Sequence, residues 1–173
     1  MKKSEKCQNP KLRSLLLKMM ATDQKYRRTM SFARVDKNHV ISMRRIIKRY
    51  GWPTFTMVGK DGAQAAWLLI QHADCVPRFQ ASCLRLLEKA VKSKEAESSD
   101  LAYLIDRVLV NTHKKQVYGT QFYNDTKGML VPRPIINKKL LAHRRKQMGL
   151  GSFTAYQRRM RQCQKMLNTT KYE

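Results

Sequence analysis

The stretch Gln71-His72-Ala73-Asp74 holds the side chain in this sequence best suited to acid–base chemistry. Imidazole titrates near neutral pH, so His72 is a candidate catalytic acid or base, and Gln71 and Asp74 are candidates for binding substrate. The alternative for His72 is a hydrogen-bonded histidine at the end of a helix. Asp74 precedes Pro77, and its alternative role is to form a turn or to cap the next helix.

A second group of polar side chains lies on a helix expected to follow Ser99. Tyr103, Asp106 and Arg107 are three and four residues apart, which places them on one helix face. Asp106 is a candidate catalytic carboxylate that would orient His72. Tyr103 and Arg107 would bind substrate, the guanidinium through paired hydrogen bonds to an anion. The alternative is an ion pair of Asp106 and Arg107 on the helix face.

The third stretch combines amides with a glycine turn. A glutamine side chain carries both a donor and an acceptor, so it can recognise a polar ligand. The candidate substrate-binding residues of this stretch are Gln116, Tyr118, Gly119, Thr120 and Gln121. The alternatives are that the glutamines tether the loop to a helix and that Tyr118, like Trp52, belongs to the core.

No motif of a known catalytic class accompanies these residues. The sequence lacks the zinc-protease, serine-hydrolase, phosphate-binding-loop and dinucleotide-binding signatures. Its acidic residues form no cluster typical of a metal site, and its cysteines lack the spacing of zinc ligands. The sequence therefore predicts no metal and no cofactor, and it leaves the reaction type open.

Positive charge is concentrated at the two ends of the chain. The formal net charge is +24: residues 1–50 contribute +12 (15 Lys and Arg against 3 Asp and Glu), residues 133–173 contribute +10 (11 against 1), and residues 51–132 only +2 (10 against 8). Such a field attracts nucleic acid, anionic membranes and acidic proteins. The basic segments lack interleaved aromatic residues and known reader signatures, so we expect only non-specific nucleic-acid binding through the ends. A generally basic proteome would explain the charge without any function.

Hydrophobic periodicity predicts the elements that would position these groups. Helices are expected at about 11–30, 38–50, 61–73, 77–91, 99–109, 137–148 and 152–167. Residues 54–59 are expected to form a short extended piece. The segment 114–136 contains several glycines and prolines, so we expect it to be irregular, with at most a short β-hairpin.

The predicted fold is all-α, a single-domain array of six or seven helices. A basic tail over 1–10 would precede the helical domain over 11–168, and a short tail over 169–173 would follow it. Four scattered cysteines fit a reducing compartment, and no apolar run approaches the roughly 20 residues of a membrane span. We therefore expect a soluble cytoplasmic protein, with secretion and delivery to a host as the alternative.

Several short motifs occur in one order along the chain. They are Gly51-Trp52-Pro53, Gln71-His72-Ala73-Asp74, Asp106-Arg107, the Gln-x-Tyr-Gly-Thr-Gln run at 116–121, Asp23-Gln24 with Arg27 or Arg28, and Arg144-Arg145 before Met148-Gly149-Leu150. Over roughly residues 12–160 the chain resembles the bacterial domain-of-unknown-function family 6624. The resemblance implies a bacterial origin and supplies no activity.

Two functions fit these observations. The first is an enzyme that acts on a polar or anionic substrate through one pocket, lined by His72, Asp106, Arg107, Gln116 and Gln121. Convergence is expected because a buried polar group without a partner costs about 1–3 kcal/mol. The second is a non-enzymatic basic module that binds nucleic acid or an acidic protein. It accounts for the charge directly and leaves the polar motifs unexplained.

Overall fold

The computed structural model describes residues 7–28 and 33–169. Within these residues the chain is mostly helical with one short antiparallel hairpin, which confirms the predicted all-α class. The chain divides into two compact units, Met1–Leu101 and Ala102–Glu173. The single domain expected over residues 11–168 stays a prediction.

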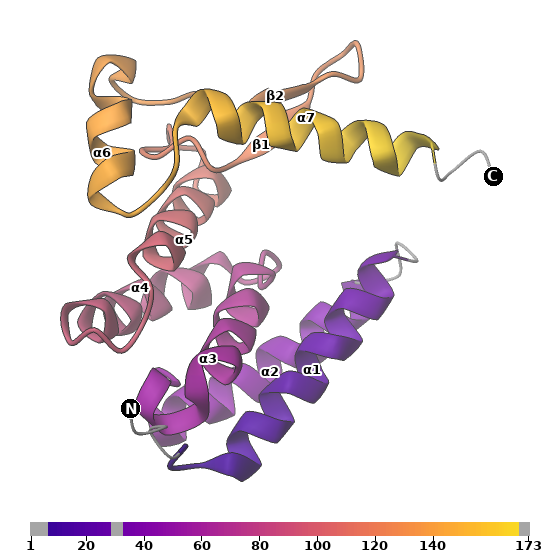
Figure 1. Ribbon diagram of the computed structural model, residues 1–173. Coiled ribbons are helices and arrows are strands. Elements are labelled where there is room, and N and C mark those ends of the chain that lie inside the picture. The colour runs from indigo at the N-terminus through magenta and orange to yellow at the C-terminus, as the bar shows by residue number, and fades with distance from the viewer. Residues whose placement is uncertain (1–6, 29–32, 170–173) are drawn as a thin grey trace, which may run out of the picture. The chain divides into compact units, whose positions relative to one another are not determined.

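The first unit is built around α3. It contains α1 (Pro10–Arg28), α2 (Ala33–Tyr50), α3 (Phe55–Gln71), α4 (Pro77–Lys92) and the start of α5 (Ser98–Asn111). α1 packs along α3, and α2 packs against both (Figure 1). The buried face of α1 repeats every three or four residues through Leu12, Leu16 and Met19, and the next residue on that face is Asp23. The apolar face of α1 thus ends in a buried carboxylate.

The first turn of α3 occupies the residues expected to be extended. The prediction for 54–59 was wrong, because Thr54 caps a helix: its hydroxyl accepts a hydrogen bond from the Met57 N–H (3.2 Å). Gly59 then adopts φ +73°, so the helix is kinked directly after Val58. A residue with a side chain rarely adopts this conformation, and the break conceals the helical period in the sequence.

The start of α2 differs from the prediction, and its end confirms it. α2 begins at Ala33, before the expected cap at Asn38, and carries Asp36 in its first turn, where a negative charge stabilises a helix. It ends at Tyr50, and Gly51 follows with φ +71°, as expected for a glycine after a helix. The last two residues of the predicted helix 11–30 lie outside the described residues.

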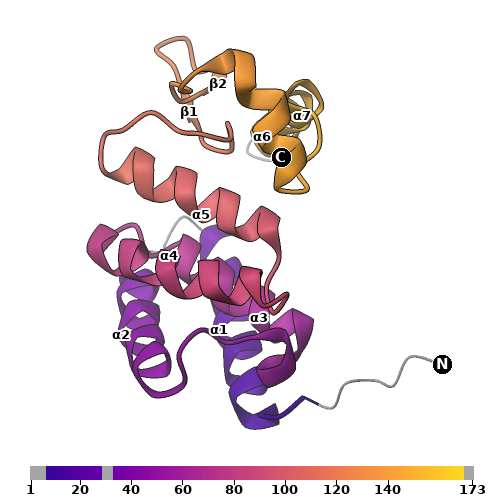
Figure 2. The same ribbon diagram turned by 90° about the vertical axis from the view of Figure 1, so that its left-hand side faces the viewer.

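The second unit combines the hairpin with the last two helices. It contains the rest of α5, β1 (Phe122–Asn124), β2 (Leu130–Pro132), the short 3-10 helix η1 (Lys138–Leu140), α6 (Leu141–Gln147) and α7 (Phe153–Thr169). Figure 2 shows β1 and β2 side by side with α6 and α7 next to them. Asn137 has a left-handed backbone (φ +41°) and precedes η1, and the predicted helix 137–148 is divided after Leu140 into η1 and α6. Ser152 caps α7 as predicted, through its bond from the Ala155 N–H (3.2 Å).

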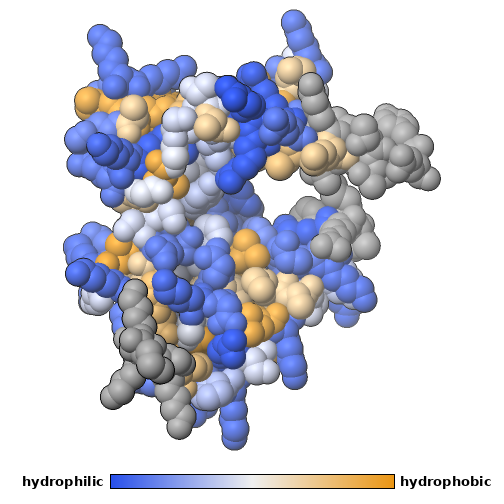
Figure 3. Space-filling view, in the orientation of Figure 1, coloured by the Kyte–Doolittle hydropathy of each residue, from blue (hydrophilic) through white to orange (hydrophobic). Residues whose placement is uncertain are grey.

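The described residues include no helix with the length and apolar character that crossing a membrane requires. Figure 3 shows hydrophilic side chains over much of the face in view, with apolar patches between them.

Candidate functional site

His72 lies at the point where α3 ends. Its backbone N–H still donates to the Leu68 carbonyl (3.0 Å), and the chain leaves the helix after it. The preceding turn is anchored by the buried Leu69 and Ile70, and the His72 side chain is 17% exposed. The imidazole is thus fixed by the core of the first unit and still reaches solvent.

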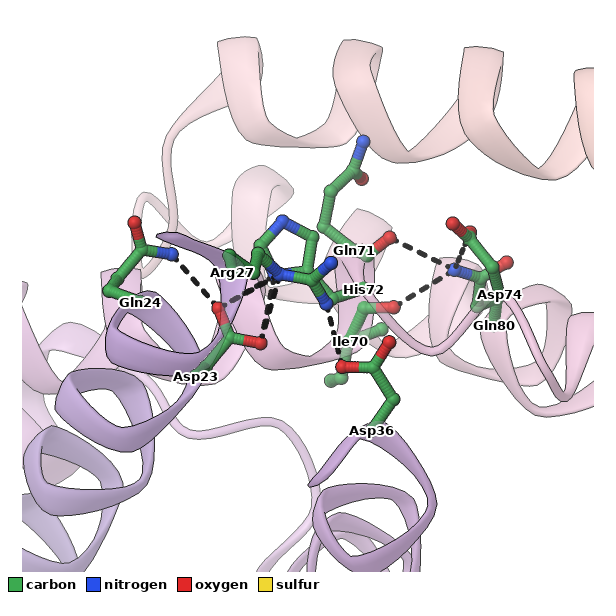
Figure 4. A network of polar contacts seen from close by, with 9 residues as sticks. All are labelled: Asp23, Gln24, Arg27, Asp36, Ile70, Gln71, His72, Asp74 and Gln80. Atoms are coloured by element: carbon green, nitrogen blue, oxygen red, sulfur yellow. Dashed lines mark hydrogen bonds and ion pairs between the residues drawn. The ribbon is translucent and has the colours of Figure 1, made fainter. Parts of the chain in front are cut away.

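The carboxylate beside His72 is that of Asp23 on α1 (Figure 4). The Nδ1 atom of His72 lies 2.9 Å from Oδ2 and 3.1 Å from Oδ1 of Asp23. Asp23 is only 1% exposed, and it also accepts a hydrogen bond from the side chain of Gln24 (2.9 Å). The carboxylate in contact with His72 is thus that of Asp23, whereas the sequence led us to predict an orienting carboxylate at Asp106.

Arg27 joins this pair to α2. It follows Asp23 by one helical turn, and its Nε lies 3.2 Å from both Asp23 oxygens and 2.8 Å from Nδ1 of His72. Its Nη2 donates to Asp36 on α2 at 2.7 Å. One guanidinium therefore holds two carboxylates from different helices and brings the imidazole to the same place.

The contacts of Nδ1 decide where the proton of a neutral His72 resides. This nitrogen carries either a proton, which it donates to Asp23, or a lone pair, which accepts the Nε–H of Arg27. A lone pair at Nδ1 would face the negative oxygens of Asp23 at about 3 Å. The buried carboxylate therefore favours the form with hydrogen on Nδ1. In that form the lone pair of a neutral His72 is on Nε2, the ring nitrogen on the other side of the imidazole from Asp23.

The charges of this network perturb two titrating groups. Burial opposes ionisation of Asp23, but hydrogen bonds and positive charge from His72 and Arg27 outweigh it and lower the pKa of Asp23 to about 2. Burial lowers the pKa of His39, a residue 8% exposed on α2, although Asp23 and Asp36 act to raise it. The Nδ1 of His39 is buried and has no hydrogen-bond partner among the residues described. At neutral pH the network thus has an ionised Asp23 and a neutral His39.

Gln80 on α4 holds the chain that follows His72. Its side-chain NH₂ donates to the carbonyls of Ile70 and Gln71 and to Oδ1 of Asp74, all at 3.1 Å. Gln80 is fully buried, so it satisfies the carbonyls left over at the end of α3. The residue at the N-cap position of α4 is Val76, which makes no side-chain capping bond. The side-chain oxygen of Gln71 is buried and finds no partner within the described chain.

In the second unit, the loop after α5 wraps around Asp106. The carboxylate accepts backbone N–H bonds from Val117 (2.7 Å), Tyr118 (3.0 Å) and Thr120 (2.9 Å), and a hydroxyl bond from Thr120 (2.9 Å). Asp106 is 0% exposed. Gly119 makes this turn possible, because its φ is +70° and an added Cβ would lie 2.8 Å from the Phe153 ring. These contacts favour a structural role for Asp106.

The glutamines of this loop also bond to protein groups. Gln116 is fully buried and accepts the Gln121 N–H (2.8 Å), and it donates to the carbonyls of Gln121 (3.0 Å) and Arg133 (2.7 Å). The side-chain oxygen of Gln121 accepts a bond from Arg107 (2.9 Å). The tethering role considered for both glutamines thus describes the contacts that they make.

A buried arginine completes the second unit. Arg145 on α6 is 2% exposed and donates to the carbonyls of Tyr118 (2.6 Å) and Gly151 (2.8 Å). Its guanidinium lies 5.2 Å from the ring centre of Tyr156, which in turn packs edge-on against Tyr103 (6.0 Å). Burial lowers the pKa of Arg145 and raises the pKa of Tyr156, and both side chains make structural contacts around the loop.

The predicted site residues therefore fall into two networks. Gln71, His72 and Asp74 belong to the first unit, and Tyr103, Asp106, Arg107 and the residues of 116–121 belong to the second. The prediction that they line one pocket stays a prediction. Five residues described above were not predicted as site residues: Asp23, Arg27, Asp36, His39 and Gln80. For Asp23 a signal existed, since it continues the apolar face of α1.

Both networks lie in a region of the chain that matches a known protein family. The model of a family of unknown function, DUF6624, matches residues 19–167 of the chain. The chain belongs to this family. The resemblance seen in the sequence is thereby confirmed. Comparisons with curated proteins and with solved structures found no match.

The matched region of this DUF6624 protein begins before Asp23 and extends beyond Tyr156, so it contains every residue of the two networks. In the described part of this DUF6624 chain, no group of three or more His, Cys, Asp and Glu side chains is arranged to hold a metal ion. What the first network offers chemically is a proton acceptor, Nε2 of His72, whose ring is held by Asp23 through the opposite nitrogen.

Proposed function

We propose that this protein is an enzyme that acts on a polar or anionic substrate by acid–base catalysis, with His72 as the proton carrier. The single observation that supports it is the contact of Nδ1 of His72 with the buried, ionised Asp23. A carboxylate in this position fixes the ring and stabilises the imidazolium that forms when Nε2 takes a proton. In this proposal Asp23 and Arg27 are positioning residues, and His72 is the group that touches substrate.

An anionic substrate is favoured by the charge of the chain. The net charge of +24 attracts anions and speeds their encounter with the protein. Arg27 already contacts Asp23 and Asp36, so we give it the task of holding the site together. We further propose a bacterial, soluble protein of the cytoplasm, in line with the resemblance and the scattered cysteines.

The state of the imidazole provides a test that needs no substrate. Nitrogen NMR of the histidine rings distinguishes hydrogen on Nδ1 from hydrogen on Nε2 in the neutral form. In the unaltered protein we expect hydrogen on Nδ1 of His72. In Asp23→Asn we expect a mixture of both forms, because the uncharged amide no longer favours hydrogen on Nδ1. Hydrogen on Nε2 in the unaltered protein would contradict the proposal.

Activity provides the second test. A panel of phosphate esters, carboxylate esters and amides is assayed with the unaltered protein, His72→Gln and a control, His143→Gln, which changes an exposed histidine of α6. Any turnover found is expected to fall by about 100-fold or more in His72→Gln, the range typical of losing an acid–base group, and to persist in the control. Turnover that survives His72→Gln with an intact fold would refute the role of His72.

A further inference from the structure

A groove lies between the tip of the hairpin and α7 in the second unit. Its volume is about 770 Å³, toward the upper end of the range of small-ligand sites. Gln164 fixes its two walls to each other: its side-chain oxygen accepts the Leu130 N–H (3.1 Å), and its NH₂ donates to Asn124 (3.0 Å) and to the Gly128 carbonyl (2.8 Å). The groove is therefore held in shape by side-chain contacts between the hairpin and the helix.

Three cationic side chains line this groove, and none of the described residues that line it carries a carboxylate. They are Lys127 at the hairpin tip and Arg158 and Arg161 on α7. None of the three forms an ion pair with a described residue. The nearest carboxylate in sequence, Asp125, accepts the backbone N–H groups of Lys127 and Met129 within the turn. Arg158 and Arg161 lie on one helix face, where like charges destabilise the helix.

Uncompensated charge of one sign in a fixed groove suits a ligand that carries a regular series of negative charges. Amide and hydroxyl groups complete the lining, from Thr154, Gln157 and Gln162. These groups can hydrogen-bond to the ribose hydroxyls and base edges that a strand of RNA carries besides its phosphates. A duplex is read by elements that project into its grooves, whereas a concave basic channel follows a single strand.

We infer that the groove between the hairpin and α7 binds the sugar–phosphate backbone of single-stranded RNA, with Lys127, Arg158 and Arg161 on the phosphates. Binding is independent of base sequence, because Lys127, Arg158 and Arg161 contact phosphates, which every nucleotide carries. The residues of this groove are not those of the His72 network, so the groove adds a binding function to the proposed catalytic one.

The test measures the fluorescence anisotropy of a short labelled oligouridylate over a range of salt concentrations. The groove variant is Lys127→Gln/Arg158→Gln/Arg161→Gln. Its matched control, Lys48→Gln/Arg34→Gln/Arg85→Gln, removes the same charge from exposed positions in the first unit. All changed residues are at the surface, and circular dichroism verifies that both variants fold.

Loss of three phosphate contacts should lower the slope of log Kd against log salt by about 2, and weaken binding at 0.1 M salt by about 100-fold. The control should change the affinity several-fold at most. Equal losses in both variants would overturn the inference, because net charge alone would then explain binding. Equally tight, groove-dependent binding of polyglutamate would assign the groove to acidic proteins, and tighter binding of duplex or single-stranded DNA would also overturn it.

Discussion

Replacement of Asp23 by asparagine should make the stability of the protein less dependent on pH between 6 and 2. The carboxylate is 1% exposed and its pKa falls from 3.8 to about 2 in the folded chain. A group whose pKa is lowered by folding stabilises the native state above its unfolded pKa, and the effect is lost as pH falls through the folded pKa. The ionised Asp23 therefore contributes most at neutral pH and little at pH 2.

The magnitude follows from the two pKa values. The contribution to the free energy of unfolding is about 2 kcal/mol at pH 6, about 1 kcal/mol at pH 3 and under about 0.5 kcal/mol at pH 2. Urea unfolding of the unaltered protein and of Asp23→Asn at these three pH values measures the difference. We expect this difference to shrink by about 2 kcal/mol from pH 6 to pH 2.

The asparagine also has a cost that does not depend on pH, since its NH₂ faces the donors of His72 and Arg27. For this reason the test is how the stability difference between the two proteins changes with pH, and not its value at one pH. Asp61→Asn serves as control: this carboxylate also pairs with an arginine, Arg13, but its side chain is 47% exposed, so a much smaller change is expected. The same stability difference at pH 6 and pH 2 for Asp23→Asn would refute the assigned pairing.

Three further predictions concern stability and are measured by urea unfolding. Asp106→Asn should destabilise the protein by about 3 kcal/mol, since a buried acceptor of charge-assisted bonds is lost, and a loss below about 1 kcal/mol would contradict its role in holding the loop. Gly119→Ala should destabilise the protein clearly more than Gly128→Ala, because both glycines have positive φ but only at Gly119 would the new Cβ clash. Equal losses of stability would show that the packing around Gly119 is not decisive. Burial first, and then the charge of Glu97, raise the pKa of Asp100 to about 7, so folding favours the protonated form. The stability that this form contributes is lost as pH rises from about 4 to 7. Asp100→Asn should make the stability fall less over this pH range, and an unchanged dependence of stability on pH would disprove the assignment.

The sequence was sufficient for the helical fold and for the position of His72. Apolar residues at helical spacing and the proline at 77 placed the end of α3 and the start of α4 close to where the structure has them. The extended piece expected at 54–59 failed because Gly59 interrupts the helix without ending it. A glycine in a short segment has the same appearance in sequence whether it breaks a helix or kinks it.

The partners of the site residues could not be predicted in the same way. Asp23 is 49 residues from His72, and their contact depends on the packing of α1 along α3, which no local pattern encodes. The contacts of Asp106 could not be predicted for a different reason. Its partners are mostly backbone N–H groups of the following loop, and every residue except proline carries this donor, so residue types do not reveal the contacts.

The wrapping of the loop around Asp106 has a consequence for amide hydrogen exchange. The N–H groups of Val117, Tyr118 and Thr120 donate to the carboxylate and that of Gln121 to Gln116, and both acceptors are fully buried. Exchange at these amides requires the loop to release the carboxylate, which is carried by α5. An irregular segment should therefore exchange as slowly as the helix beside it, and the two should open as one cooperative unit.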